Sequence, residues 1–239
     1  MIFSLTSLSA HNLEQSVNSE DRSPDNVARD IYRHPYETLS FFGIKPDMTV
    51  VELNPGGGWY TEILANYIHY PGTLITAQGS YYFEGFEKKM NSNPMYGRVE
   101  IVNLNSNLAE PNSVDAVITF RNLHNWLGAD MDSIFRSSFK ALKPGGSFGV
   151  VEHRAKPGTD FETMKTSGYV TEDHAIEVAL KHGFELVEKS EINANPKDTK
   201  DYPKGVWTLP PRLRLDDVDR DKYKSIGESD RMTLLFRKP

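Results

Sequence analysis

The segment 50–62 runs from a buried strand through three consecutive glycines directly into a helix. Its first residues, VVEL, are apolar apart from one acid, which is typical of a strand that helices cover on both faces. Gly56, Gly57 and Gly58 have no β-carbon, so the backbone can come close to a ligand. The helix that begins near Trp59 directs its unpaired amide groups toward the same place. This segment predicts an α/β fold with a small-molecule cofactor site after its first strand.

Strands and helices alternate along most of the chain. We expect strands at 49–53, 73–77, 99–102, 116–120, 147–152, 184–190 and 233–236, and helices at 59–68, 82–90, 131–142 and 172–181, with two more helices between Ser23 and Gly43. The strand cores LITA, AVITF and FGVVE are almost continuously apolar, as in parallel sheets buried on both faces. The pattern predicts a doubly wound, Rossmann-like α/β domain.

Composition narrows the classes of partner. The chain has 239 residues, no cysteine and a net charge of −6, without a dense basic run. We therefore expect no nucleic-acid partner and no thiolate metal site. No apolar run approaches the roughly 20 residues of a membrane helix, so we expect no membrane insertion. The sequence leaves open whether the protein is a monomer or a homodimer.

The two ends of the chain differ from the middle. Residues 1–22 are expected to be a disordered segment or the remnant of a signal peptide, because 1–10 is apolar and ends in small residues. We expect a cytoplasmic protein, or a periplasmic or exported one if that remnant is real. Residues 23–239 form the predicted domain. Within it, 193–230 is rich in Lys, Asp and Pro, and Trp207 favours an inserted lid over a plain connection.

Polar side chains follow two of the expected strands. The run 121–126 (RNLHNW) gathers a cation, two amides, an imidazole and an indole after the fourth strand. We expect Arg121 and His124 to be catalytic, with His124 as a base, and Asn125 and Trp126 to contact a substrate. The alternative for His124 is a structural bond between its imidazole and a neighbouring carbonyl.

The fifth strand is followed by a second polar group, and ligands bind at the carboxyl ends of parallel strands. His153 is expected to contact the substrate and Arg154 to assist catalysis. Two arginines near one cleft would suit an anionic substrate, whereas the alternative for Arg154 is an ion pair. Tyr169 is a candidate for an apolar wall. The histidine spacing indicates no structural zinc site, and it leaves open a metal held jointly by His124 and His153.

Several motifs resemble those of class I S-adenosylmethionine-dependent methyltransferases. Glu52 occupies the acidic position before the glycine turn, and Gly56 and Gly58 match the second and third glycines of that family's motif I. The segments 115–118 and 142–146 look like its later motifs. More narrowly, RHPYETLSFFGIKP, PGGGWYTEIL, RNLHNW, VEHRA, GYVTED and DRMTLLFRKP resemble a group of bacterial proteins known as predicted methyltransferases. The resemblance implies a mostly parallel seven-stranded sheet with an antiparallel last strand, and methyl transfer to a small molecule.

The same resemblance implies a set of residues that hold S-adenosylmethionine. They are Glu52, Asn54, Gly56, Gly57, Gly58, Gln78 and Asn105. Three of them depart from the family pattern. Asn54 replaces the first glycine, and Gln78 replaces the acid that holds the ribose hydroxyls. Asn105 stands near the position where many relatives have an acid for the adenine amino group.

Two other classes of function compete with this one. The departures at Asn54, Gln78 and Asn105 would also suit a methyltransferase-fold binding protein without transfer activity. A nicotinamide oxidoreductase is disfavoured, because Thr61 stands where the third glycine of a dinucleotide motif belongs.

Overall fold

The computed structural model describes residues 12–239 and contains one seven-stranded sheet in the order β3-β2-β1-β4-β5-β7-β6. The strands are β1 (Thr49–Leu53), β2 (Thr73–Gln78), β3 (Val99–Asn103), β4 (Val114–Phe120), β5 (Leu142–His153), β6 (Glu185–Ser190) and β7 (Arg231–Arg237). All neighbours pair in parallel except β7, which is antiparallel to both β5 and β6. The predicted fold class, a Rossmann-like sheet with an antiparallel last strand, is confirmed.

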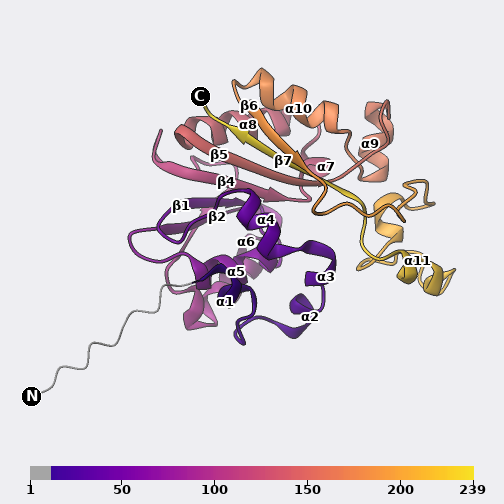
Figure 1. Ribbon diagram of the computed structural model, residues 1–239, viewed down its shortest axis with the longest axis horizontal. Coiled ribbons are helices and arrows are strands. Elements are labelled where there is room, and N and C mark those ends of the chain that lie inside the picture. The colour runs from indigo at the N-terminus through magenta and orange to yellow at the C-terminus, as the bar shows by residue number, and fades with distance from the viewer. Residues whose placement is uncertain (1–11) are drawn as a thin grey trace, which may run out of the picture.

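Helices cover both faces of this sheet (Figure 1). They are α1 (Leu13–Val17), α2 (Pro24–Val27), α3 (Asp30–Arg33), α4 (Pro35–Phe41), α5 (Trp59–Tyr67), α6 (Phe83–Asn91), α7 (Leu123–Trp126), α8 (Ala129–Ala141), α9 (Phe161–Ser167), α10 (Glu172–Lys181) and α11 (Arg220–Ile226). α1, α4 and α5 pack on one face, and α8 and α10 pack on the other.

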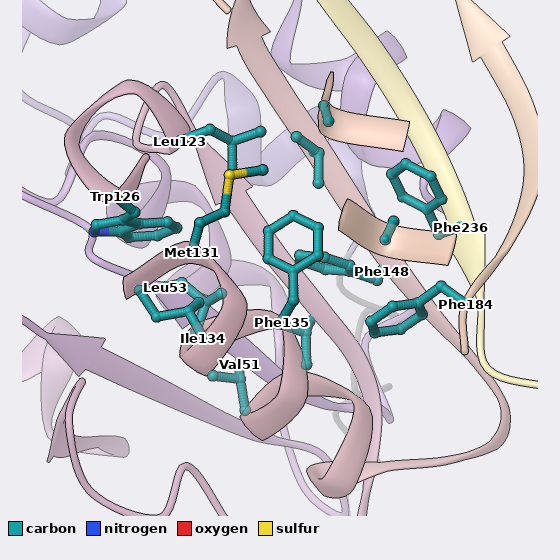
Figure 2. Packing of buried hydrophobic residues seen from close by; sticks show 14 of the residues in the cluster. Val51, Leu53, Leu123, Trp126, Met131, Ile134, Phe135, Phe148, Phe184 and Phe236 are labelled. Carbon is teal, nitrogen blue, oxygen red and sulfur yellow. The ribbon is translucent and has the colours of Figure 1, made fainter. Parts of the chain in front are cut away.

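The largest of the four hydrophobic clusters in the described residues lies under α8 (Figure 2). Phe135 of α8 meets Phe148 of β5 edge to face, with 5.0 Å between ring centroids, and Phe184 lies 5.0 Å from Phe148. Such offset aromatic pairs add to the free energy of burial. They fix α8 over β5, and parallel pairing holds β5 beside β4.

The register brings the ends of three strands together. Leu53, the last residue of β1, pairs with Ala77 of β2 and with Thr119 of β4. Residues directly after β1, β2 and β4 are therefore neighbours at the carboxyl edge of the sheet, where open α/β sheets bind ligands.

The N-terminal boundary differs from the expected one. Residues 1–11, which include the possible signal remnant, lie outside the described part of the chain. From Asn12 onward the chain is folded, so disorder through residue 22 is wrong. α1 buries Leu13 and Val17 against the α5 face of the sheet, and Arg22 pairs with Asp30 at 2.7 Å. The sequence did not predict this helix, because two apolar residues in one short segment are too few to form a recognisable helical pattern.

Two segments from opposite ends of the chain meet beyond the carboxyl ends of the strands. Helices α2 and α3 come from one side, and residues 193–230, which include α11, come from the other (Figure 1). Between residues 12 and 239, no helix combines the length and the apolar character needed to cross a membrane.

Candidate functional site

The glycine turn after β1 is open toward solvent. Gly56 and Gly58 have φ angles of 60° and 77°, in the left-handed region that glycine adopts without strain. A β-carbon built on Gly56 or Gly57 would meet no atom within 4 Å. Gly58 then starts α5 and supplies no side-chain cap, so the first amide groups of the helix face the turn. The local structure is that of an anion or cofactor cradle.

Asn54 explains one departure from the expected glycine pattern. Its φ is 47°, so the position requires a left-handed residue, and asparagine is the side chain that tolerates this best after glycine. The Asn54 amide donates to Oδ1 of Asn122 at 2.9 Å, and its own oxygen accepts from the backbone of Gly79 at 3.3 Å. The side chain that replaces glycine therefore ties the ends of β1, β2 and β4 together.

Glu52 and Gln78 lie behind the turn rather than on a cleft wall. Glu52 is buried and accepts a hydrogen bond from Thr61 at 2.6 Å, and burial raises its pKa to about 7. Gln78 is also buried, and its Oε1 accepts from the amide of Gly56 at 3.3 Å. These two side chains support the glycine turn from inside.

Asn105 does not reach the turn. It is exposed after β3, where its backbone amide donates to Asn103, and it is not among the residues that line the cleft. The structure thus places Gln78 and Asn105 outside the position expected for ligand contacts.

The loop after β4 projects into the same region. Arg121 has a φ of 60°, which is unusual for a side chain with a β-carbon and costs of order 1 kcal/mol. Asn122 is buried and donates to the backbone oxygens of Leu53 and Asn54, each at 3.2 Å. The short helix α7 follows and carries His124. The hydrogen bonds from Asn122 to the end of β1 hold the strained backbone of Arg121 in place.

A buried carboxylate fixes the imidazole of His124. Glu152, at the end of β5, is fully buried, and its Oε1 lies 3.0 Å from Nδ1 of His124. Its other oxygen accepts the backbone amide of His124 at 3.3 Å. Because a carboxylate can only accept, Nδ1 carries the proton and Nε2 has a free lone pair. This is the arrangement of a histidine base with an orienting acid.

His153 lies beside this pair. Its ring centroid is 5.3 Å from that of His124, and its Nδ1 lies 2.5 Å from Oγ of Ser229. Burial, with Arg231 adding positive charge nearby, holds the pKa of His153 well below its usual range, so the ring is neutral at pH 7.

His124, Glu152 and His153 also place three possible metal-ligand atoms within 4.8 Å of one another. The carboxylate, however, already accepts hydrogen bonds from both histidines. Nearby positive charge on Arg121 and Arg231 opposes a divalent cation. The trio is therefore better suited to holding a proton than a metal.

Four arginines surround one buried carboxylate at the back of the site. Glu228 accepts hydrogen bonds from Arg29 at 2.6 Å and from Arg33 at 3.3 Å, and it forms a short contact with Arg231. Arg121 lies 3.8 Å from the same carboxylate. These arginines lower the pKa of Glu228, although burial acts in the opposite direction. Of the four, the sequence identified only Arg121.

Two expected site residues lie elsewhere. Arg154 forms ion pairs with Asp230 at 2.9 Å, Glu172 at 3.0 Å and Glu191 at 2.7 Å. Tyr169 is buried, and its hydroxyl donates to Asp198 at 3.0 Å. Neither lines the cleft, so the expectation that both face the substrate is corrected: their partners hold them in the protein interior.

The remaining side chains enclose one cleft of about 850 Å³. Its walls include Asn54, Gly56, Gly57, Arg121, Asn122, His124, Asn125, Trp126 and His153. Residues 206–214 form its roof, where the indole of Trp207 meets the ring of His124 edge to face at 6.1 Å. Arg214 lies over the indole at 4.8 Å. The glycine turn and the histidine therefore line the same cleft.

Comparisons with known proteins agree with this architecture. The family model described as a methyltransferase domain matches residues 51–150. No curated protein matches the chain significantly.

Solved structures show the same fold at low sequence identity. An S-adenosylmethionine-dependent methyltransferase from Aquifex aeolicus is 14% identical with a TM-score of 0.63, over 95% of this chain and 99% of that one. Geranyl diphosphate C-methyltransferase from Streptomyces coelicolor is 12% identical with a TM-score of 0.64, over 94% and 87%. The [4+2]-cyclase SpnF is 17% identical with a TM-score of 0.62, over 95% and 91%. The chain has the class I methyltransferase fold, with a methyltransferase domain match across its first five strands.

Proposed function

We propose that the protein transfers a methyl group from S-adenosylmethionine to a small, anionic acceptor. One observation carries the proposal: the open glycine turn and the Nε2 side of a carboxylate-oriented histidine share a single cleft. The matched methyltransferase domain, which covers the glycine turn and the β4 loop, supports the same reaction.

The cleft fits such a donor. Gly56 and Gly57 leave space that any β-carbon would occupy, and the amide groups at the start of α5 face the glycine turn. About 850 Å³ lies at the upper end of ligand pockets and accommodates two small molecules. Asn54 and the glycines would hold the donor, which supplies an electrophilic methyl group on its sulfonium.

His124 is assigned the role of general base. Methyl transfer is an in-line displacement, so the acceptor atom must be positioned and, if it is a hydroxyl or an amine, must lose its proton. Nε2 of His124 is the group able to accept that proton. Glu152 holds the tautomer and stabilises the imidazolium that forms. Trp207 covers the cleft beside the histidine, with its indole edge to face with the imidazole.

A second function is favoured by one observation. Nε2 of Gln78 is buried without a hydrogen-bond partner in the described residues, and no acid follows β2 to hold a ribose. This suits a binding protein of methyltransferase fold that does not perform transfer.

Calorimetry and labelling separate the two functions. Titration with S-adenosylmethionine and S-adenosylhomocysteine is expected to give micromolar binding. Methyl-labelled donor, incubated with a panel of small anionic metabolites, should then label one of them. Absence of binding at millimolar donor would refute the transferase; binding without label transfer to any acceptor would favour the binding protein.

A further inference from the structure

The cleft concentrates positive charge in an acidic protein. Between residues 12 and 239, six arginines line it, together with one acidic side chain, Glu228. The arginines are Arg29, Arg33, Arg121, Arg212, Arg214 and Arg231. The chain as a whole has a net charge of −6, so composition does not explain this local excess. Such a field attracts anions into the cleft.

Glu228 cannot neutralise the arginines around it. It offers one negative charge to four guanidinium groups, those of Arg29, Arg33, Arg121 and Arg231. Three positive charges are therefore left close together. Burial, followed by repulsion from Arg231, lowers the pKa of Arg121 to about 10. Burial and the charge of Arg121 hold the pKa of Arg33 well below its usual range.

Two hydrogen-bond donors in this arginine cluster also lack an acceptor in the described part of the chain. Nη1 of Arg33 and Nε of Arg231 are buried and have no partner within the described part of the chain. A buried donor without a partner costs free energy of about 1–3 kcal/mol. Arg29 and Arg121, by contrast, are one-fifth to one-quarter exposed and can touch a ligand in the cleft. The excess positive charge and the unpaired N–H donors would both be satisfied by an oxyanion with several oxygens.

We propose that the arginines around Glu228 bind a phosphoryl group, so that the acceptor is a phosphate or diphosphate ester. This inference deepens the proposed function and rests on it in one respect: the phosphate ester is the methyl acceptor only if the protein transfers a methyl group. A single carboxylate would leave two of the three positive charges unbalanced, whereas a phosphate dianion leaves one and a diphosphate trianion leaves none. Guanidinium forks also match phosphate oxygens geometrically.

The position of the cluster agrees with such an acceptor. Arg121 lies three residues before His124 on the same loop, and Arg231 acts electrostatically on His153, whose ring packs against His124. An ester whose phosphate lies on Arg121 and Arg29 would therefore present the rest of the molecule along the His124 wall. The arginines position the acceptor, and the histidine removes its proton.

Calorimetry with inorganic pyrophosphate and phosphate tests this site directly. We expect binding that weakens with added salt, with pyrophosphate tighter than phosphate and both tighter than succinate. Arg29→Gln should weaken pyrophosphate binding by about tenfold or more, because it removes a charged hydrogen bond at a position that is only one-quarter exposed. Arg136→Gln, on the exposed side of α8, is the matched control and should leave binding unchanged.

A second variant reverses the sign of the effect. Glu228→Gln removes the carboxylate that competes with the ligand, so pyrophosphate should raise the melting temperature of this variant more than that of the parent. No binding of pyrophosphate at 10 mM, or binding no tighter than that of succinate, would overturn the phosphoryl assignment. The two proposals fail separately: donor binding without pyrophosphate binding refutes this one alone, and pyrophosphate binding without donor binding refutes methyl transfer alone.

Discussion

The carboxylate of Glu152 lies 3.0 Å from Nδ1 of His124, and it also accepts the backbone amide of that histidine. Glu152→Gln keeps the size of the side chain but loses the charge that stabilises the imidazolium. We expect methyl-transfer turnover to fall by about 10²-fold or more, with donor affinity unchanged. Initial rates and calorimetry on the same samples measure the two quantities.

His124→Ala provides the companion measurement. If the two residues act as a unit, the double variant should be no slower than His124→Ala alone. Multiplicative losses would show instead that Glu152 acts independently of the imidazole.

The glycine turn offers a test of donor placement. Gly57 lies outside the left-handed region, and a β-carbon there meets open space, so Gly57→Val should fold normally. Its side chain would occupy the cradle, and we expect measurable binding of S-adenosylmethionine to disappear. Gly85→Ala, in the interior of α6, is the control: it should keep donor affinity and stabilise the helix by up to about 1 kcal/mol. Normal donor affinity in Gly57→Val would place the donor elsewhere.

Glu52 makes stability depend on pH. Burial raises its pKa from 4.5 to about 7. Below pH 4.5 the carboxyl is protonated in both folded and unfolded chains and costs nothing. Between pH 4.5 and 7 the unfolded chain ionises first, so the free energy of unfolding falls with rising pH, by about 3 kcal/mol in total.

Glu52→Gln removes this ionisation and keeps an acceptor for Thr61. In urea unfolding, the variant should be more stable than the parent at pH 8, and the difference should vanish near pH 4. A difference independent of pH would contradict the assignment.

The approach of α4 to the sheet depends on a residue without a side chain. A β-carbon on Gly149 of β5 would lie 2.6 Å from Cγ of Phe42, which is buried. Gly149→Ala should therefore lower the free energy of unfolding by about 1–3 kcal/mol through overpacking. Gly149→Ala combined with Phe42→Leu should recover part of the loss, and a fully additive double variant would argue against the contact.

Local patterns predicted most of the fold. β1 and α10 have the expected boundaries: an apolar run marks β1, and the structure shows that the Thr171 side chain caps α10 by accepting from the amide of His174. β5 begins at Leu142 rather than 147, since a Pro-Gly-Gly segment has no strand pattern of its own and is held by pairing with β4 at Val114.

The site was predicted only where its residues follow strands. Arg121 and Arg154 look alike in the sequence, since each directly follows one of two adjacent strands. Their neighbours in the structure differ. Arg154 forms ion pairs with three carboxylates, whereas other arginines lie close enough to Arg121 to repel its charge. Arg29 and Glu228 are 199 residues apart, and no periodicity connects residues so distant.

The ion pairs of Glu228 with Arg29 and Arg33 join the beginning of the fold to the segment that leads into its last strand, β7. During biosynthesis the glycine cradle and His124 emerge well before Trp207, Glu228 and Arg231. A nascent chain that ends at α10 would thus possess the cradle and the base but neither roof nor complete anion anchor. The complete arginine cluster can form only once Arg231 of β7 has been made.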